Sequence, residues 1–478
     1  MDDRISQLPD EILSYILTML SIKDLLKTSV LSKRWCKLWG LRKDLYFDIH
    51  NVLGTEMELL EKGYLVDVTR YSRTNRCVNL DLSQKEFVKR VDQFLKNFHG
   101  TTINSFFINF YLDCQQSNTI DQWIRFAIVR GVERINLLFL GRSYVNRTTQ
   151  NKHYKFDSAL FSETNASTVK HLHLEYCLIC HPTNRDFTLF KNLRSLSLRH
   201  TKLDEMFIES LLSSCQHLEE LCLISCEFKS SMPKIVSSSL CHLEVAVCYY
   251  LFDNNYEADL NLDIVDCPKL TLLEYHGLDL DTLDLNTPLL KNINFSISSK
   301  ELNAFLSLCA TFPELEILNV NTNFKVTTSL KITQSLKHLK RLNFIIDNSY
   351  ILHNEDYDPL WILNILQASP FLQKLTIMYI NSNFIANQKD IRDVEKMFSH
   401  DEVKVIELGG CVGNWFEIEL VMNILKYAHK LEQIVASPYW REDELSDWNH
   451  DPMWFQSGRK RMSEKLQEVI GLEKLVLI

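Results

Sequence analysis

Residues 193–223, LRSLSLRHTKLDEMFIESLLSSCQHLEELCL, contain the pattern that decides the fold. The pattern is apolar-x-x-apolar-x-apolar, and it begins at Leu193 and again 25 residues later, at Leu218. Its last positions alternate between apolar and polar side chains, which predicts a short strand with one buried face. Between the copies, residues 205–214 carry apolar side chains at helical spacing. The stretch therefore predicts a strand, a helix that returns the chain, and a second strand parallel to the first.

The same pattern recurs over most of the chain. Clear copies begin at Leu193, Leu218, Leu240, Leu290, Leu315, Leu339, Leu372, Val403 and Leu472, and weaker ones at Ile103, Val132, Val169, Leu270 and Leu431. The starts at 193, 218 and 240, like those at 290, 315 and 339, are 22 to 25 residues apart, within the roughly 20 to 29 residues of a leucine-rich repeat. Each unit can bury its apolar face only against its neighbours. We therefore predict an α/β solenoid, a curved parallel sheet with helical return segments, and insertions on its outer side after residue 344.

The first forty residues predict three short helices instead. Leu8 and Pro9 precede a helix with apolar residues at helical spacing, since the first turn of a helix tolerates a proline. Ser21 is positioned to cap a second helix, with Asp24 three residues later, and Ser32 a third. A module of about 40 residues rarely closes a core by itself. Its unburied apolar side therefore predicts a protein partner.

Three runs in this module, residues 8–13 (LPDEIL), 29–35 (SVLSKRW) and 38–39 (LW), resemble the F-box of plant F-box/leucine-rich-repeat proteins. In that family the F-box binds a Skp-type adaptor that hangs from a cullin, and the rest of the chain presents substrates for ubiquitin transfer. The alternative is an ordinary three-helix cap on a larger domain. The resemblance implies that the residues contacting the adaptor are Leu8, Pro9, Ile12, Ile16, Leu26, Val30 and Trp35.

Two later stretches are similar to the same family. Residues 123–132 resemble the helix before an early repeat, and residues 403–408 with 417–425 resemble the C-terminal FBD region, although this chain inserts an aromatic, acidic stretch at 438–454. Residues 83–98 predict an amphipathic helix, capped by Ser83, that joins the F-box to the repeats. We expect four parts: an F-box (1–45), a linker with the first repeats (46–130), the solenoid (131–400) and FBD-like C-terminal repeats (401–478).

One cysteine motif suggests a cofactor. Cys177, Cys180 and His181 match the C-x-x-C-H pattern of c-type haem attachment. The two thiols with His171 or His173 could also hold zinc, although no second C-x-x-C pair completes four ligands. Both alternatives compete with a structural interpretation of the same cysteines.

The structural interpretation places Cys177 at a corner of the repeat. It follows Leu174 by three residues, where leucine-rich repeats place Asn or Cys to bond the backbone, and Cys226, Cys248 and Cys411 occupy the same phase. The thirteen cysteines, an odd number without tight regular spacing, are more typical of reduced buried residues than of a disulfide framework. We favour the corner and expect neither a cofactor nor a metal.

Composition and motifs favour a binding protein over an enzyme. The balance of 52 Lys and Arg against 61 Asp and Glu, a net charge of -9, opposes nucleic-acid binding. No apolar run reaches the roughly 18 residues of a membrane span, and the charged start does not resemble a signal peptide, so we expect a protein of the nucleus or cytoplasm. The catalytic motifs G-x-S-x-G, H-E-x-x-H and G-x-x-x-x-G-K do not occur. The basic triplet at 459–461 fits a short nuclear signal or, more commonly, a solvated helix start.

Substrate recognition is expected on the concave strand face, whose side chains lie between the core positions of each repeat. These include His171, His173, Ser195, Arg199, Glu220, His242, Asn292, Asn294, Asn319, Asn321, Arg341, Asn343, Lys374 and Thr376. We select Asn319, Arg341 and Lys374 as the candidate hot spot, because arginine is over-represented in binding hot spots. The sequence thus predicts a substrate-recognition subunit of a Skp-cullin-F-box ubiquitin ligase. The alternatives are a Skp-binding regulator without ubiquitin delivery and an independent leucine-rich scaffold.

Overall fold

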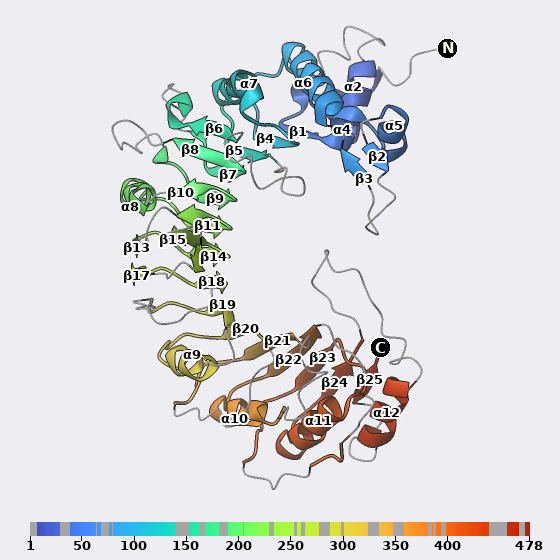
Figure 1. The fold of residues 1–478 in the computed structure, drawn as a ribbon, viewed down its shortest axis with the longest axis vertical. Helices are drawn as coiled ribbons and strands as arrows, with labels where there is room; N and C mark the ends of the chain where they lie inside the picture. Colours follow the sequence, from blue (N-terminus) through green and yellow to red (C-terminus); the bar gives the residue numbers. More distant parts are fainter. Residues whose placement is uncertain are drawn as a thin grey trace. The chain divides into compact units, whose positions relative to one another are not determined.

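A computed structural model shows the fold of the chain. It describes residues 7–28, 39–63, 65–67, 76–78, 80–139, 153–161, 168–180, 190–203, 205–228, 234–252, 256–259, 263–276, 287–297, 301–323, 334–347, 358–380, 385, 389–392, 398–438, 457–467 and 474–478. The chain forms two compact units, residues 1–237 with 248–258 and residues 238–247 with 259–478. In each unit the predicted strand repeats form a parallel sheet (Figure 1).

The sheet of the first unit follows the predicted repeats. Its strands, in spatial order, are β1 (Asp44–Asp48), β4 (Ser105–Asn109), β5 (Arg134–Leu138), β7 (His171–Glu175), β9 (Ser195–Arg199) and β11 (Glu220–Ile224). Leu196 lies in register with Leu172 on one side and Leu221 on the other, so the apolar positions form continuous buried rows. The strand β1 was not predicted. Its Leu45 and Phe47 are fully buried, so the sheet begins at residue 44, before the first predicted repeat.

The sheet of the second unit has the same construction. Its order is β14 (His242–Ala246), β18 (Leu272–His276), β19 (Asn292–Ile297), β20 (Ile317–Asn323), β21 (Arg341–Asp347), β22 (Lys374–Ile380), β23 (Val405–Gly409), β24 (Gln433–Ala436) and β25 (Leu475–Leu477). Each predicted copy of the pattern from residue 240 onward contributes one of these strands. The prediction of a parallel strand solenoid is therefore confirmed.

The return segments are only partly helical. Helices occur as α7 (Ser117–Val129), α8 (Glu205–Ser214), α9 (Leu302–Cys309), α10 (Trp361–Ala368), α11 (Trp415–Tyr427) and α12 (Arg459–Gln467), and α8 has the predicted bounds. Elsewhere the return is extended. A second sheet, in the first unit, has the order β16 (Tyr256–Asp259), β15 (Tyr249–Phe252), β12 (Glu227–Phe228), β10 (Lys202–Leu203), β8 (Cys177–Cys180) and β6 (Tyr154–Asp157). Two further short strands are β13 (Lys234–Val236) in the first unit and β17 (Asp263–Asp266) in the second.

The corner of the repeats has the predicted cysteines. The residue before each corner position has positive φ: Tyr176 (54°), His200 (50°), Ser225 (51°), Val247 (51°) and Gly410 (64°). The next residue in these five corners is Cys177, Thr201, Cys226, Cys248 or Cys411, and the four cysteines are buried. The chain therefore makes the same sharp turn at the end of each of these strands.

The corner thiols bond the backbone. The Sγ of Cys177 donates to the Glu175 carbonyl at 3.5 Å, that of Cys226 to the Leu198 carbonyl at 3.3 Å, and that of Cys248 to the Leu223 carbonyl at 3.3 Å. Burial raises the pKa of the Cys177 thiol well above its usual range, which disfavours the thiolate that a metal requires. The corner interpretation is confirmed for these cysteines, while His181 lies outside the described residues.

The N-terminal helices pack against the start of the first sheet. They are α1 (Asp10–Thr18), α2 (Ile22–Thr28), the 3-10 turn η2 (Trp39–Leu41), α4 (Ile49–Leu53), α5 (Glu56–Glu61) and α6 (Leu80–Lys96). The Trp39 ring stacks on Phe94 of α6, with centroids 5.6 Å apart, and the backbone N–H of Ile22 donates to Asn51 at 2.7 Å. Besides these helices, β2 (Leu65–Asp67) and β3 (Arg76–Val78) form a small antiparallel pair, and the 3-10 turns η3 (Cys114–Gln116) and η5 (Ser158–Phe161) lie farther along the chain.

The three predicted helix caps have different outcomes. Ser21 caps α2, since its Oγ accepts from the Asp24 N–H at 3.0 Å. Ser83, however, is not a cap. The helix α6 begins three residues earlier, at Leu80, and Ser83 is fully buried inside it, because the tertiary core encloses that face. The third helix predicted from Ser32 falls outside the described residues.

Candidate protein-binding surfaces

Helix α1 divides its apolar residues between the core and the surface. Leu13 and Leu17 are buried, whereas Ile12 is 48% exposed, Tyr15 63% and Met19 67%. Ile12, Tyr15 and Met19 follow one another at spacings of three and four residues, so they share one face of the helix. We call these three residues the α1 face. Contiguous exposed apolar side chains of this kind mark a protein interface.

The residues predicted to contact the adaptor lie partly on this face. Ile12 and Pro9 are exposed, and Leu8, Ile16 and Leu26 are half-buried. Val30 and Trp35 lie outside the described residues. The sequence prediction omitted Tyr15 and Met19, although their helical spacing from Ile12 was a signal that could have found them.

The α1 face is anchored to the first repeat through Arg42. This residue is only 8% exposed. Its Nη1 donates to the Leu20 carbonyl at 3.3 Å and its Nε to the Asp44 carbonyl at 3.0 Å. Lys23 also forms an ion pair with Glu58 of α5. The helix that carries the exposed side chains is therefore held against the strand β1 rather than attached by a loose linker.

The three predicted hot-spot residues occupy adjacent strands of the second unit. Arg341 and Lys374 are register partners on β21 and β22, whereas Asn319 on β20 is the partner of Asn343, two positions farther along the strand. Arg341 is exposed, and its side chain forms no ion pair or hydrogen bond within the described residues. Lys374 contacts Glu407 at 2.9 Å. The structure thus brings two cations together, but a carboxylate compensates one of them.

A hydrogen-bonded row of polar side chains runs across the neighbouring strands. Asn343 donates to Asn319 at 2.5 Å, and Asn319 donates to Asn292 at 3.5 Å. On the neighbouring strands, Glu274 of β18 accepts from Asn294 of β19 at 3.1 Å and contacts His242 of β14 at 3.0 Å. These hydrogen bonds lower the pKa of Glu274, and the bond with His242 has the larger effect. The sequence prediction placed the asparagines and His242 on the strand face, but it did not include Glu274 and did not reveal that these side chains bond to one another.

The strand face of the first unit carries an aromatic pair. Tyr46 of β1 stacks on Phe107 of β4, with ring centroids 4.1 Å apart, and Tyr46 is 40% exposed. This aromatic pair was missed because β1 was not predicted. On β7, burial lowers the pKa of His173 to about 4. His173 is therefore neutral near pH 7, which reduces its use as a cationic contact.

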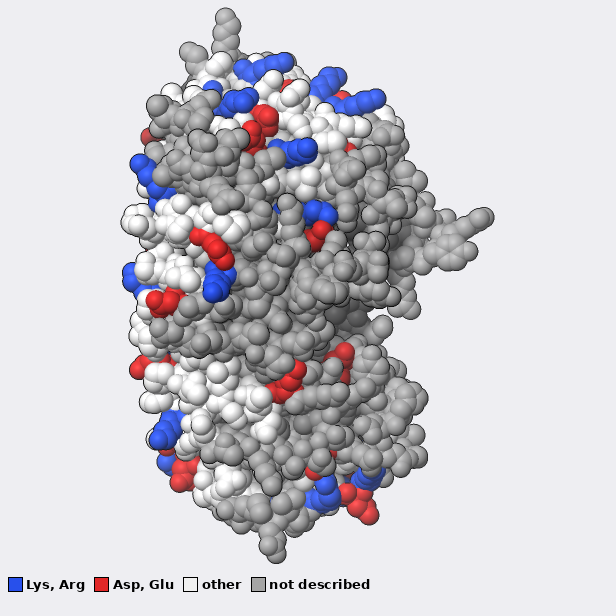
Figure 2. Space-filling model, turned by 60° about the vertical axis from the view of Figure 1, so that its left-hand side comes forward, with Lys and Arg blue, Asp and Glu red and all other residues white. Residues whose placement is uncertain are grey.

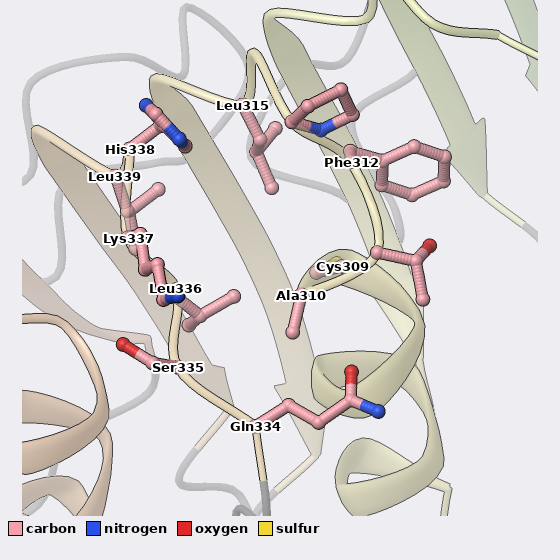
Figure 3. A pocket seen from close by; sticks show the side chains of 12 residues that line it. Cys309, Ala310, Phe312, Leu315, Gln334, Ser335, Leu336, Lys337, His338 and Leu339 are labelled. Atoms are coloured by element: carbon pink, nitrogen blue, oxygen red, sulfur yellow. The ribbon is translucent and has the colours of Figure 1, made fainter.

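A cavity of 420 Å³ lies at the N-terminal ends of β20 and β21, between the segments that precede these two strands (Figure 3). Its lining includes a thiol and an imidazole, those of Cys309 and His338, which lie on different walls of the cavity. Cys309 is buried, and burial raises the pKa of its thiol. A protonated thiol is a weak nucleophile, so this lining does not present an activated catalytic pair.

Charges are mixed over the surface that Figure 2 presents. Lys and Arg alternate with Asp and Glu on the described residues in that view, without a continuous basic stripe. Charged side chains of neighbouring repeats also pair with one another, as Lys170 does with Glu133 at 2.7 Å and Lys340 with Glu316 at 2.9 Å. Within the described part of the chain, no group of three or more His, Cys, Asp or Glu residues could hold a metal ion. The same residues contain no helix long and apolar enough to cross a bilayer.

The parallel strand repeats, with a short helical module before them, define a leucine-rich-repeat protein. Comparison with family models agrees with this class. Residues 94–465 match the model described as At1g61320/AtMIF1, LRR domain, and residues 5–45 match the F-box domain. The chain belongs to the At1g61320/AtMIF1 leucine-rich-repeat family and carries an F-box before its repeats. The resemblance to plant F-box/leucine-rich-repeat proteins is confirmed.

Two proteins of Arabidopsis thaliana illustrate what the chain is similar to. The putative F-box/LRR-repeat protein At4g00320 is 27% identical over 333 residues, which cover 67% of this chain and 58% of the relative. The F-box/FBD/LRR-repeat protein At5g56420 is 26% identical over 274 residues, 56% of this chain and 54% of the relative. The chain spans little more than half the length of these two relatives. A solved structure, a TLR13-ssRNA13 complex, is similar at TM-score 0.35 and 17% identity over 71% of this chain and 48% of that chain; so low a score carries no argument.

Proposed function

We propose that this protein is the substrate-recognition subunit of a Skp-cullin-F-box ubiquitin ligase. Its F-box docks a Skp-type adaptor, its repeats bind the protein to be ubiquitinated, and it acts by scaffolding without chemistry of its own. The observation that carries the proposal is the exposed α1 face, because it lies within the residues that match the F-box. The proposed place of action is the nucleus or cytoplasm.

The size of the α1 face is consistent with a real interface. Fully burying a large apolar side chain is worth roughly 1.5 to 3 kcal/mol, and about half to two-thirds of each of its three side chains is exposed. Their burial against the adaptor would contribute roughly 3 to 5 kcal/mol. Each 1.4 kcal/mol corresponds to about a tenfold change in affinity. The face therefore supplies a substantial part of a stable complex.

The remaining predicted parts belong to the same proposal. Leu8, Pro9, Ile16, Leu26, Val30 and Trp35 would extend the adaptor contact around the α1 face. Substrate would bind the strand face of the second unit, with Asn319, Arg341 and Lys374 at its centre. We also propose the boundaries at residues 45, 130 and 400, with residues 401–478 as the FBD-like region.

The test is binding of the full chain to a purified Skp-type adaptor. The double change Ile12→Ala with Tyr15→Ala should weaken binding by at least about thirtyfold, because it removes roughly 2 to 3 kcal/mol of apolar burial. Phe371→Ala is the matched control, since Phe371 is 57% exposed but lies in the second unit. It should leave the affinity within about twofold. Unchanged binding of the double variant would refute the docking proposal.

Co-purification distinguishes the competing functions. Recovery of both adaptor and cullin supports a ligase subunit. Recovery of the adaptor alone favours a Skp-binding regulator without ubiquitin delivery, and recovery of neither favours an independent scaffold. Proximity labelling with and without the F-box, under proteasome inhibition, would identify the substrate.

A further inference from the structure

The strand face of the first unit contains buried polar atoms that have no partner. Oδ1 of Asn109 on β4, Nε2 of His173 on β7 and Nε of Arg199 on β9 are buried, and none of them makes a hydrogen bond within the described residues. All three side chains lie opposite the buried apolar rows, because they alternate with buried residues along their strands. Folded proteins leave few buried polar atoms unpaired. Their concentration on one face therefore indicates that another molecule completes their bonds.

Two charged residues on this face offset each other without pairing. Glu175 of β7 is the register partner of Arg199, yet neither side chain forms an ion pair or hydrogen bond in the part of the chain that the structure describes. Burial raises the pKa of Glu175, and the charge of Arg199 opposes this shift. Since burial lowers the pKa of His173 to about 4 and keeps it neutral near pH 7, the centre of the face carries opposite charges but little net charge.

An aromatic pair continues the face toward β1. The ring of Tyr46 stacks on Phe107, and the Asn109 side chain hydrogen-bonds to Tyr46. Tyrosine and arginine are over-represented in binding hot spots. Exposed charged residues begin the strands, as Arg134 does in β5 and Glu220 in β11, so the face has the polar rim that is typical of protein interfaces. We call the following five residues the first-unit face: Tyr46, Phe107, Asn109, His173 and Arg199.

The dimensions of the first-unit face fit a short extended peptide. The strands β1, β4, β5, β7 and β9 are consecutive neighbours in the sheet, and adjacent strands lie about 4.8 Å apart. Tyr46 and Arg199 are therefore separated by about 19 Å across the sheet, a span that about six residues of extended chain cover. Asn109, His173 and Arg199 are each partly exposed, so a change of side-chain rotamer can bring their buried atoms to the surface.

We propose that the first-unit face binds an extended, uncharged peptide segment of about six residues from the protein that is recognised for ubiquitination. This inference rests on the proposed function and adds a contact to that of the second unit. A peptide backbone carries both donors and acceptors, so it can accept from the Nε–H of Arg199 and donate to Oδ1 of Asn109. A charged side chain would be repelled by either Glu175 or Arg199. A proline or aromatic ring of the segment can stack on Tyr46.

The test uses the full chain and, as the probe, a library of random heptapeptides displayed on phage. Peptides are selected for binding to the unmodified protein and against binding to the Arg199→Ala variant. We expect enrichment of peptides that have no net charge and contain a proline or an aromatic residue. Enrichment of charged peptides would overturn the proposal, and so would the absence of any enrichment.

An independent variant then tests the site with synthetic copies of the enriched peptides. In fluorescence anisotropy, His173→Leu should weaken binding by at least about tenfold, a loss of about 1.4 kcal/mol. The matched control is Arg134→Ala, which removes an exposed cation at the rim of the same sheet and should alter the affinity by no more than about twofold. Equal affinities of the unmodified protein and His173→Leu would contradict the site.

Thermal unfolding separates a binding role from a structural one. The side chain of His173 makes no hydrogen bond within the described residues, so His173→Leu should keep or raise the Tm. A lower Tm with unchanged peptide binding would show that His173 only supports the fold. If His173→Leu does not fold, Arg199→Lys replaces it. This change keeps the charge but removes the Nε–H donor, and it should also weaken binding.

Two further measurements distinguish this inference from its alternatives. The peptide assay contains no adaptor, so it tests the first-unit face even if adaptor binding, and with it the ligase function, fails. The same variants should bind the adaptor normally, because the changed residues lie on strands and not on α1. Sedimentation velocity tests self-association. A dimer of the unmodified protein that His173→Leu abolishes would identify a second copy as the occupant and overturn the assignment to a substrate peptide.

Discussion

Replacing Gly410 with alanine should strongly destabilise the second unit. Gly410 follows β23 and has φ of 64°, a left-handed conformation that costs an alanine about 1 to 2 kcal/mol. A Cβ at this position would collide with the carbonyl oxygen of Tyr379, which belongs to the neighbouring backbone on β22. Forcing that strand to move adds about 1 to 3 kcal/mol by analogy with overpacked cores. The expected loss in unfolding free energy is therefore roughly 2 to 5 kcal/mol.

Gly131→Ala separates the two contributions. Gly131 has a similar φ of 71°, but no heavy atom lies within 4 Å of its built Cβ. It should therefore lose only the conformational part, about 1 to 2 kcal/mol. Urea unfolding followed by tryptophan fluorescence measures both variants, with Trp415 of α11 as a reporter close to the Gly410 corner. A loss at Gly410 no larger than that at Gly131 would refute the close backbone approach at this corner.

Three further predictions address the corner, the C-terminal core and the strand face. Cys177→Asn should keep the stability nearly unchanged in thermal melting, whereas Cys177→Leu should lose roughly 1 to 3 kcal/mol, because it places a larger side chain without a donor in a buried corner. Burial raises the pKa of Glu417 to about 7 despite backbone donors at 2.8 to 3.1 Å. The protonated Glu417 carboxyl therefore contributes its full stability below pH 4.5, and this contribution is lost as the pH rises through 7. In the Glu417→Gln variant, the unfolding free energy should depend less on pH over this interval. An unchanged pH dependence would contradict the raised pKa of Glu417. Charge reversal of Arg341 and Lys374 should lower substrate ubiquitination with adaptor binding unchanged, and a larger effect from Glu209→Lys on α8 would instead place recognition on the return segments.

The sequence alone determined the repeats and the local turns. Strand positions and the bounds of α8 followed from periodicity, because each strand or helix shows its buried face in a spacing of two or 3.6 residues. The Ser21 cap followed from a contact between residues three apart. The corner cysteines followed from their constant phase after the last leucine of the strand. All of these depend on residues that are near one another in the chain.

Only the tertiary structure decided which of several similar side chains face outward or pair with one another. Ile12 and Leu13 are adjacent apolar residues, and packing of α1 on the first repeat buries one and exposes the other. Arg392 bonds to Glu419 of α11, which lies 27 residues farther along the chain. Periodicity cannot assign these partners, because they are set by how separate elements pack. The α1 face therefore became visible only when distant segments were placed side by side.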